Sequence, residues 1–111
     1  MKTQTIEFNN GEIKARIIVS EATALQGMKR SRLAFEAGAI DDPDLRILRG
    51  FYYPALMAAA KQIEIEGVLN DVTFDDFAAL PELLVKQWEE AAFALNPHWL
   101  PQDADEKKAN D

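Results

Sequence analysis

The sequence contains no cysteine, one histidine and two serines, and these shortages limit the chemistry open to the chain. Without cysteine it can form neither a disulfide nor a thiolate ligand for a metal ion. Nucleophilic catalysis requires an activated nucleophile beside a base. Ser20 is better explained as a helix cap, and His98 follows a predicted helix end, where it is expected to bond a carbonyl or lie in solvent. We therefore expect a protein that is not an enzyme and has no catalytic residues.

A metal site or a phosphate-binding loop is not expected either. The first, third, fifth and twelfth positions of a calcium-binding loop are matched by Asp71, Thr73, Asp75 and Glu82. The sixth position of such a loop turns sharply and requires glycine, but here it is Asp76. Acidic residues at helix starts are explained by the helix dipole. The five glycines are scattered, so there is no glycine-rich phosphate loop, and we expect no metal and no cofactor.

Long apolar runs and an excess of positive charge are missing too. No run approaches the length of a membrane span, and residues 1–5 lack the apolar stretch of a secretory signal, which favours the cytoplasm. Twelve basic side chains face nineteen acidic ones, and the net charge of −7 disfavours binding to phosphate backbones. The basic cluster of Lys29, Arg30 and Arg32 is interpreted as a solvated helix face. We expect neither a membrane nor a nucleic acid as partner.

Apolar residues, by contrast, make up 48% of the chain and are spread along it. This favours a folded domain of α+β class, mostly α, with an N-terminal β-hairpin followed by a bundle of about four helices. The single domain is expected to span residues 1–101. Residues 102–111 have almost no apolar content and are expected to form a disordered acidic tail.

The hairpin is expected over residues 3–19. Ile6 and Phe8 alternate with polar neighbours, and a second alternating run ends at Val19. Between the two runs, Asn9-Asn10-Gly11 provides the residue types that a tight turn requires. Two antiparallel strands are therefore predicted.

A first helix is expected at about 20–37, with Ser20 as its N-cap and Gly38 as its stop. Four of its residues share one face at helical spacing, which is typical of an amphipathic surface helix: Ala24, Met28, Ser31 and Phe35.

A second helix is expected at about 43–66, because Asp42-Pro43 combines a capping aspartate with a proline at the first helical position. Its apolar residues form two stripes on nearly opposite sides, as in a helix that is central to its domain. Pro54 is expected to cause a kink or a short break near 50–54, since the proline ring crowds the carbonyl of Gly50.

Two shorter helices are expected at about 73–80 and 81–96. Thr73 is the predicted cap of the first, and Pro81 opens the second. Leu84 and Trp88 belong to the face of the last helix that should be buried.

Two aromatic residues near the end of the chain do not fit this pattern. Phe93 lies opposite the apolar face of the last helix, and Trp99 lies between two prolines. Either Trp99 folds back over Phe93 and seals the helix end, or both belong to a surface that binds a partner. The exposed edge of the central helix, near Tyr53 and Met57, is the other expected part of that surface.

Three short patterns occur together in the C-terminal half: Thr73-Phe74-Asp75-Asp76-Phe77, Leu80-Pro81-Glu82 and Asn96-Pro97-His98-Trp99. Together they resemble the C-terminal half of the tail assembly chaperones of long-tailed phages and prophages. The opening of the chain, Thr5-Ile6-Glu7-Phe8 followed by Asn10-Gly11-Glu12, is also similar to such proteins. The middle of the chain is similar only in being helical.

The resemblance implies a non-enzymatic protein in the cytoplasm of a bacterial host. Such a chaperone binds the tape measure protein and helps to recruit tail tube subunits, and such families often also make a longer form by ribosomal frameshifting. Two other classes of function stay open: a structural subunit of a phage particle, and a small regulatory or antitoxin-like protein-binding module.

Overall fold

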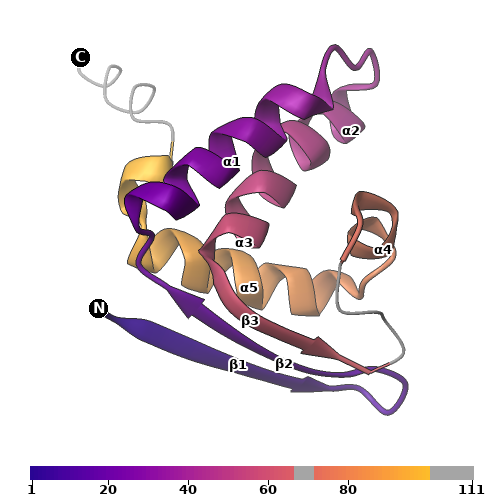
Figure 1. Cartoon of the computed structure of the whole chain (residues 1–111). Helices are drawn as coiled ribbons and strands as arrows, with labels where there is room; N and C mark the ends of the chain where they lie inside the picture. Colours follow the sequence, from indigo (N-terminus) through magenta and orange to yellow (C-terminus); the bar gives the residue numbers. More distant parts are fainter. Residues whose placement is uncertain (67–71, 101–111) are drawn as a thin grey trace, which may run out of the picture.

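The first two strands form the hairpin that the sequence predicts. The computed structural model of the chain describes residues 1–66 and 72–100, and it begins with β1 (Thr3–Asn9) and β2 (Lys14–Ser20), which pair antiparallel (Figure 1). In the turn, the Asn10 Oδ1 accepts hydrogen bonds from the backbone N–H groups of Glu12 and Ile13 at 2.9 and 2.8 Å. Gly11 has a φ of 91°, a conformation that residues with a Cβ rarely adopt.

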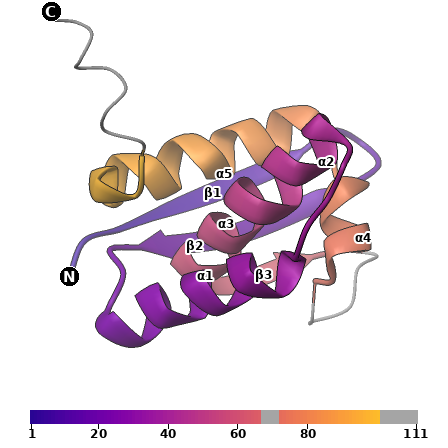
Figure 2. The same cartoon turned by 90° about the horizontal axis from the view of Figure 1, so that it is seen from above.

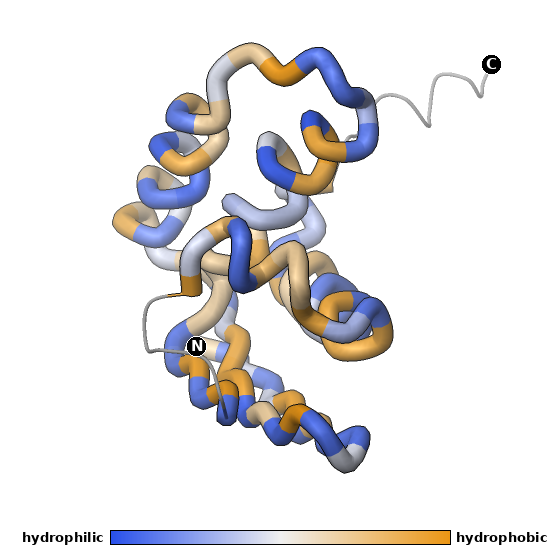
Figure 3. Tube along the Cα trace, turned by 90° about the vertical axis from the view of Figure 1, so that its right-hand side faces the viewer, coloured by the Kyte–Doolittle hydropathy of each residue, from blue (hydrophilic) through white to orange (hydrophobic). Residues whose placement is uncertain are grey.

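A third strand, β3 (Ala60–Ile65), corrects the prediction of a single helix over 43–66. It pairs antiparallel with β2, and the sheet has the order β1-β2-β3. From Gln62 onward polar and apolar residues alternate, and this period of two fits a strand with one buried face. The alternation is visible along the strands in Figure 3. Helical spacing would put Ile63 and Ile65 on opposite sides, whereas in the strand both face the core.

Helix α1 (Ala24–Ala37) begins later than the predicted Ser20, because β2 continues to that residue. The cap is Thr23, whose hydroxyl accepts from the Gln26 N–H at 3.2 Å while the Gln26 side chain accepts from the Thr23 N–H at 3.0 Å. This reciprocal pair satisfies two donors that the first turn leaves open. Gly38, with a φ of 67°, ends the helix as predicted.

The middle of the chain forms one continuous helical segment of three parts: α2 (Pro43–Ile47), the π-helical turn η1 (Leu48–Tyr52) and α3 (Tyr53–Ala59). Asp42 caps it as predicted, since its Oδ1 accepts from the Asp44 N–H at 2.9 Å. The Tyr53 N–H bonds the Leu48 carbonyl five residues earlier. The interruption expected near 50–54 is therefore a wide turn immediately before Pro54, and not a break.

Three C-terminal elements follow: α4 (Phe74–Ala78), α5 (Glu82–Leu95) and the 3-10 turn η2 (Pro97–Trp99). The Thr73 hydroxyl caps α4 by accepting from the Asp76 N–H at 3.2 Å, as predicted. The helix bounds agree closely with the expected 73–80 and 81–96. Residues 102–111, predicted as a tail, lie outside the described residues.

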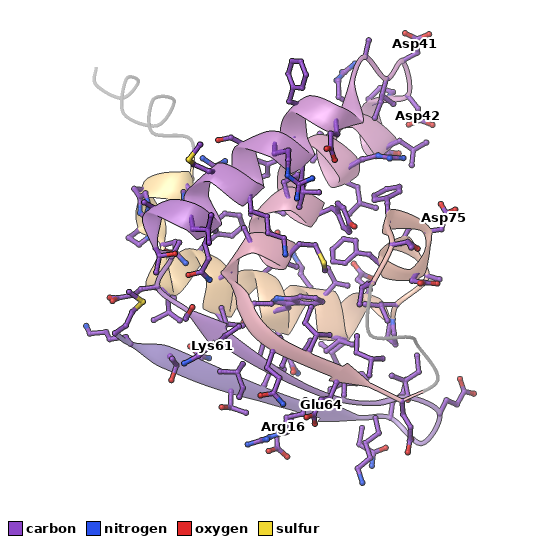
Figure 4. The ribbon with its side chains drawn as sticks, in the orientation of Figure 1. Arg16, Asp41, Asp42, Lys61, Glu64 and Asp75 are labelled. Carbon is purple, nitrogen blue, oxygen red and sulfur yellow. The ribbon has the colours of Figure 1, made fainter. Side chains whose placement is uncertain are left out.

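The helices cover one face of the sheet. Helix α5 lies on the sheet, and α3 lies between α5 and α1 (Figures 1 and 2). Leu84 and Trp88 are buried, which confirms the predicted inner face of α5. On the opposite face of the sheet, over the described ranges, there is no helix, and Arg16 and Glu64 project there (Figure 4). Over the described ranges, the fold is a small α+β domain in which the helical segments lie on one side of a three-stranded sheet, with α5 in direct contact with it. None of the described helices is long and apolar enough to cross a membrane.

Candidate functional site

The residues considered for catalysis and metal binding lie where they stabilise the fold. Ser20 is buried, and its hydroxyl accepts a hydrogen bond from the Gln26 Nε2 at 3.4 Å. Asp42 lies at the start of α2 and Asp75 at the start of α4, as expected for residues that stabilise helix N-termini (Figure 4). Across residues 1–66 and 72–100, no three His, Asp or Glu side chains are grouped so that they could hold a metal ion. Asp71, the first position of the calcium-loop pattern, lies outside the described residues.

Phe93, expected on a partner surface, is packed inside the domain. Its side chain is 7% exposed, and its ring stacks on that of Phe51 with 5.5 Å between centroids and 9° between planes. Tyr52 contacts the same ring edge-on at 6.2 Å. Helix α5 is thus apolar on two sides, because one side faces the sheet and the other faces η1. A single buried face was the wrong expectation for this helix.

Trp99 is also buried, and it closes the end of α5. The Arg30 guanidinium lies over its ring, 4.9 Å from the centroid. Trp99 was expected over Phe93, but the group that lies over its indole is Arg30 of α1, and the Phe93 ring stacks on Phe51. Arg30, predicted to lie on a solvated face, is half-buried in this contact.

The expected exposed edge near Tyr53 and Met57 is largely enclosed. Met57 is buried, and the Tyr53 hydroxyl donates to the Val72 carbonyl at 3.0 Å. Burial raises the pKa of the Tyr53 hydroxyl above its ordinary value. Both residues line an open crevice of about 250 Å³, which Lys29 and Lys61 also line. Whether these residues bind a partner stays a prediction, but Phe93, Trp99 and Met57 do not form an exposed surface of the folded chain.

Helix α1 carries three of the most exposed large apolar side chains among the described residues. Leu25, Met28 and Phe35 are 79%, 70% and 86% exposed. None of the 14 residues of α1, which the structure describes in full, is buried. Figure 2 shows the helix at the margin of the helical layer, with α3 on one side only. The predicted shared face of Met28 and Phe35 exists, but it faces solvent. We name the four residues Leu25, Met28, Arg32 and Phe35 the α1 stripe.

The opposite side of α1 packs on α3 through a mixture of polar and apolar groups. The Gln26 Nε2 donates to the Ala58 carbonyl at 2.9 Å, and Leu33 packs against the core. This inner side of α1 is less apolar than the outer side. Hydropathy alone therefore predicts the wrong side of the helix as the one that packs on α3. The spacing of Leu25, Met28, Arg32 and Phe35 is the signal in the sequence that could have identified the stripe.

Positive charge borders the α1 stripe in a chain whose net charge is −7. Arg32 lies within it and pairs with Glu36 at 3.0 Å, where both side chains are more than half exposed. Lys29 follows Met28 in the sequence. It lines the crevice, as Lys61 does. An apolar surface with cations along one side suits a partner of amphipathic character.

Comparisons of the chain with protein-family models, with curated proteins and with solved structures give no match. The candidate surface therefore depends on the geometry of this chain alone.

Proposed function

We propose that this chain is a non-enzymatic tail assembly chaperone of a long-tailed phage or prophage. It binds an apolar helical segment of the tape measure protein and keeps that segment in solution until tail tube subunits assemble around it. The observation that carries the proposal is the exposure of Leu25, Met28 and Phe35 on one side of α1.

The α1 stripe has no evident role in holding the domain together. Its three large apolar side chains leave most of their surface in water, so they contribute little to the folded state. Burying such a side chain against a partner stabilises a complex by about 1.5–3 kcal/mol. An exposed apolar surface bordered by polar groups is typical of a protein-binding site. Methionine and aromatic side chains also suit a site that must accept varied apolar sequences.

The resemblance to tail assembly chaperones supports the proposal from a separate part of the chain. In its last motif, the Asn96 side chain is buried, and Trp99 packs beneath Arg30. These motif residues stabilise the end of α5 and its contact with α1. The resemblance therefore concerns the scaffold, whereas the α1 stripe is the surface offered to a partner.

The test is co-expression with the tape measure protein of the same phage, followed by purification of the complex. The wild-type chain should keep the tape measure protein soluble and remain bound to it. The triple variant Leu25→Ser, Met28→Ser, Phe35→Ser should fold normally and bind at least about 100-fold more weakly, since it removes three burial contributions.

The matched control is Leu83→Ser, because Leu83 lies on α5, away from the stripe, and is 62% exposed. It removes an exposed apolar residue of the same kind and should leave the complex intact. A tape measure protein that is equally soluble without this chain, with no complex after purification, would contradict the proposed function.

A further inference from the structure

We propose that the α1 stripe binds an amphipathic α-helix with acidic residues along one side of its apolar face. This inference rests on the proposed function and specifies the chemistry of the partner at the same surface. Three properties of α1 support it: the spacing of its apolar residues, the small residues on one side of the stripe, and the cations on the other.

The spacing indicates a helical partner. Leu25, Met28, Arg32 and Phe35 follow one another by three, four and three residues. Two packed helices contact one another at this alternation of three and four, because it keeps one line of side chains facing the partner. At a rise of about 1.5 Å per residue, the stripe runs for about 15 Å, or nearly three turns of a facing helix.

Small residues on one side of the stripe allow close approach: Ala24, Gly27 and Ser31. Gly27 is the informative one, since glycine inside a helix is destabilising relative to alanine. Within the described part of the chain, a Cβ added at Gly27 would meet no neighbouring heavy atom within 4 Å, and its φ is not positive. Folding therefore does not require glycine there, whereas a second helix lying close to the α1 backbone would benefit from it.

Cations on the other side determine the charge of the partner. Arg32 lies within the stripe and Lys29 lies beside it, and Lys29 and Lys61 both line the crevice. Arg32 can exchange Glu36 for a carboxylate of the partner at little cost, because both side chains of the pair are more than half exposed and an exposed ion pair is weak. Acidic residues on the facing helix would therefore be favoured, and basic ones would be repelled.

A second copy of this chain fits the α1 stripe less well. If two α1 helices paired antiparallel through their stripes, the same side of each helix would lie together, and Lys29 and Arg32 of one copy would lie near the same residues of the other. Repulsion between these cations opposes such a dimer. A membrane surface also fits less well, because its phosphates favour cations on both sides of an amphipathic helix. On α1 the second side carries only small uncharged residues.

The test uses two designed helical peptides of about three heptads with leucine at the core positions. One carries glutamate at the flanking positions and the other carries lysine. Fluorescence anisotropy at low salt should show the glutamate peptide binding at least tenfold more tightly, and added salt should reduce this difference. The double variant Lys29→Glu, Arg32→Glu should bind the lysine peptide more tightly than the glutamate peptide. The double variant Leu25→Ser, Met28→Ser should bind both peptides more weakly. Leu83→Ser is again the matched control and should change neither the affinity for the two peptides nor the preference between them.

Three outcomes would overturn the inference: equal binding of the two peptides, concentration-dependent dimerisation that Met28→Ser abolishes, or co-sedimentation with anionic phosphatidylglycerol vesicles that exceeds peptide binding. If the tape measure protein binds through Leu25 and Met28 but the peptides show no charge preference, the proposed function stands and the inferred partner chemistry is wrong. If the glutamate peptide binds as expected but the tape measure protein does not, the partner chemistry stands and the proposed function is wrong.

Discussion

The Asn96 Oδ1 accepts a hydrogen bond from the Ala22 N–H at 2.8 Å, although 74 positions separate the two residues in the sequence. The Asn96 Nδ2 donates to the carbonyls of Ser20 and Ala92, each at 3.1 Å. One buried amide thus connects the end of α5 with the segment that joins β2 to α1. It fixes the point at which α1, and with it the α1 stripe, leaves the sheet.

Replacing this amide should destabilise the domain. Asn96→Ala would leave the Ala22 N–H and the Ser20 carbonyl without their partners in a mostly buried position. We expect the free energy of unfolding to fall by about 2–3 kcal/mol, measured by chemical denaturation. The neighbouring His98 is exposed, so His98→Ala should change stability by no more than about 0.5 kcal/mol. Similar losses for the two variants would contradict the role given to Asn96.

Two substitutions of Trp88 should separate the contribution of packing to stability from that of hydrogen bonding. Its side chain is fully buried, and among the described residues no group accepts a hydrogen bond from its indole N–H. Trp88→Ala should therefore cost about 3–5 kcal/mol, the range for truncating a large buried aromatic residue. Trp88→Phe should cost less than about 2 kcal/mol, because it removes an unpartnered donor and retains much of the contact with Phe77. Thermal unfolding of both variants measures the difference, and equal costs would contradict it.

Phe93 should contribute to the stability of the domain and not to an exposed binding surface. Because its ring stacks on Phe51 at 5.5 Å, Phe93→Ala should destabilise the domain by about 3–5 kcal/mol. A double-mutant cycle with Phe51→Ala should give a coupling of about 0.5–1.5 kcal/mol. If Phe93→Ala leaves stability unchanged, the stacked arrangement is wrong.

Alkaline pH should weaken the fold through Tyr52 and Tyr53. Burial raises the pKa of the Tyr52 hydroxyl above its ordinary value of 10.0, and the nearby Glu89 carboxylate raises it further. Burial is also the main cause of the raised pKa of Tyr53. The folded chain therefore retains these protons more tightly than the unfolded chain does. The resulting stability is complete below the unfolded pKa and is lost as the pH rises through the folded pKa.

The free energy of unfolding should accordingly fall as the pH rises above about 10. The double variant Tyr52→Phe, Tyr53→Phe should show a shallower fall over the same range. Denaturation curves at a series of alkaline pH values measure this effect, and an unchanged slope in the variant would show that other groups cause it.

Local features of the fold could be predicted from the sequence, because their causes are local. The Asn10-Gly11 turn and the caps at Asp42 and Thr73 depend on residues within a few positions of one another. Strand β3 was missed because its partner is β2, far away in the sequence, and Ile63 and Ile65 also fit an apolar helix. Secondary structure that depends on tertiary pairing is not determined by local propensity.

The candidate site was missed for a related reason. The pattern of α1 shows which residues share a face, but not which face contacts α3. That choice depends on the Gln26 hydrogen bond to the Ala58 carbonyl and on the shape of the neighbouring helix. Phe93 was assigned to a surface because η1, which covers it, could not be placed from the sequence.

Photo-crosslinking in cells that assemble phage tails tests the proposed contact most directly. A photoreactive amino acid in place of Met28, in the centre of the α1 stripe, should crosslink the chain to the tape measure protein. The same amino acid in place of Leu83, which is similarly exposed on α5, should give little of that product. Crosslinking of equal yield at both positions, or a tape measure product at position 83 alone, would contradict the assignment of α1 as the chaperone surface.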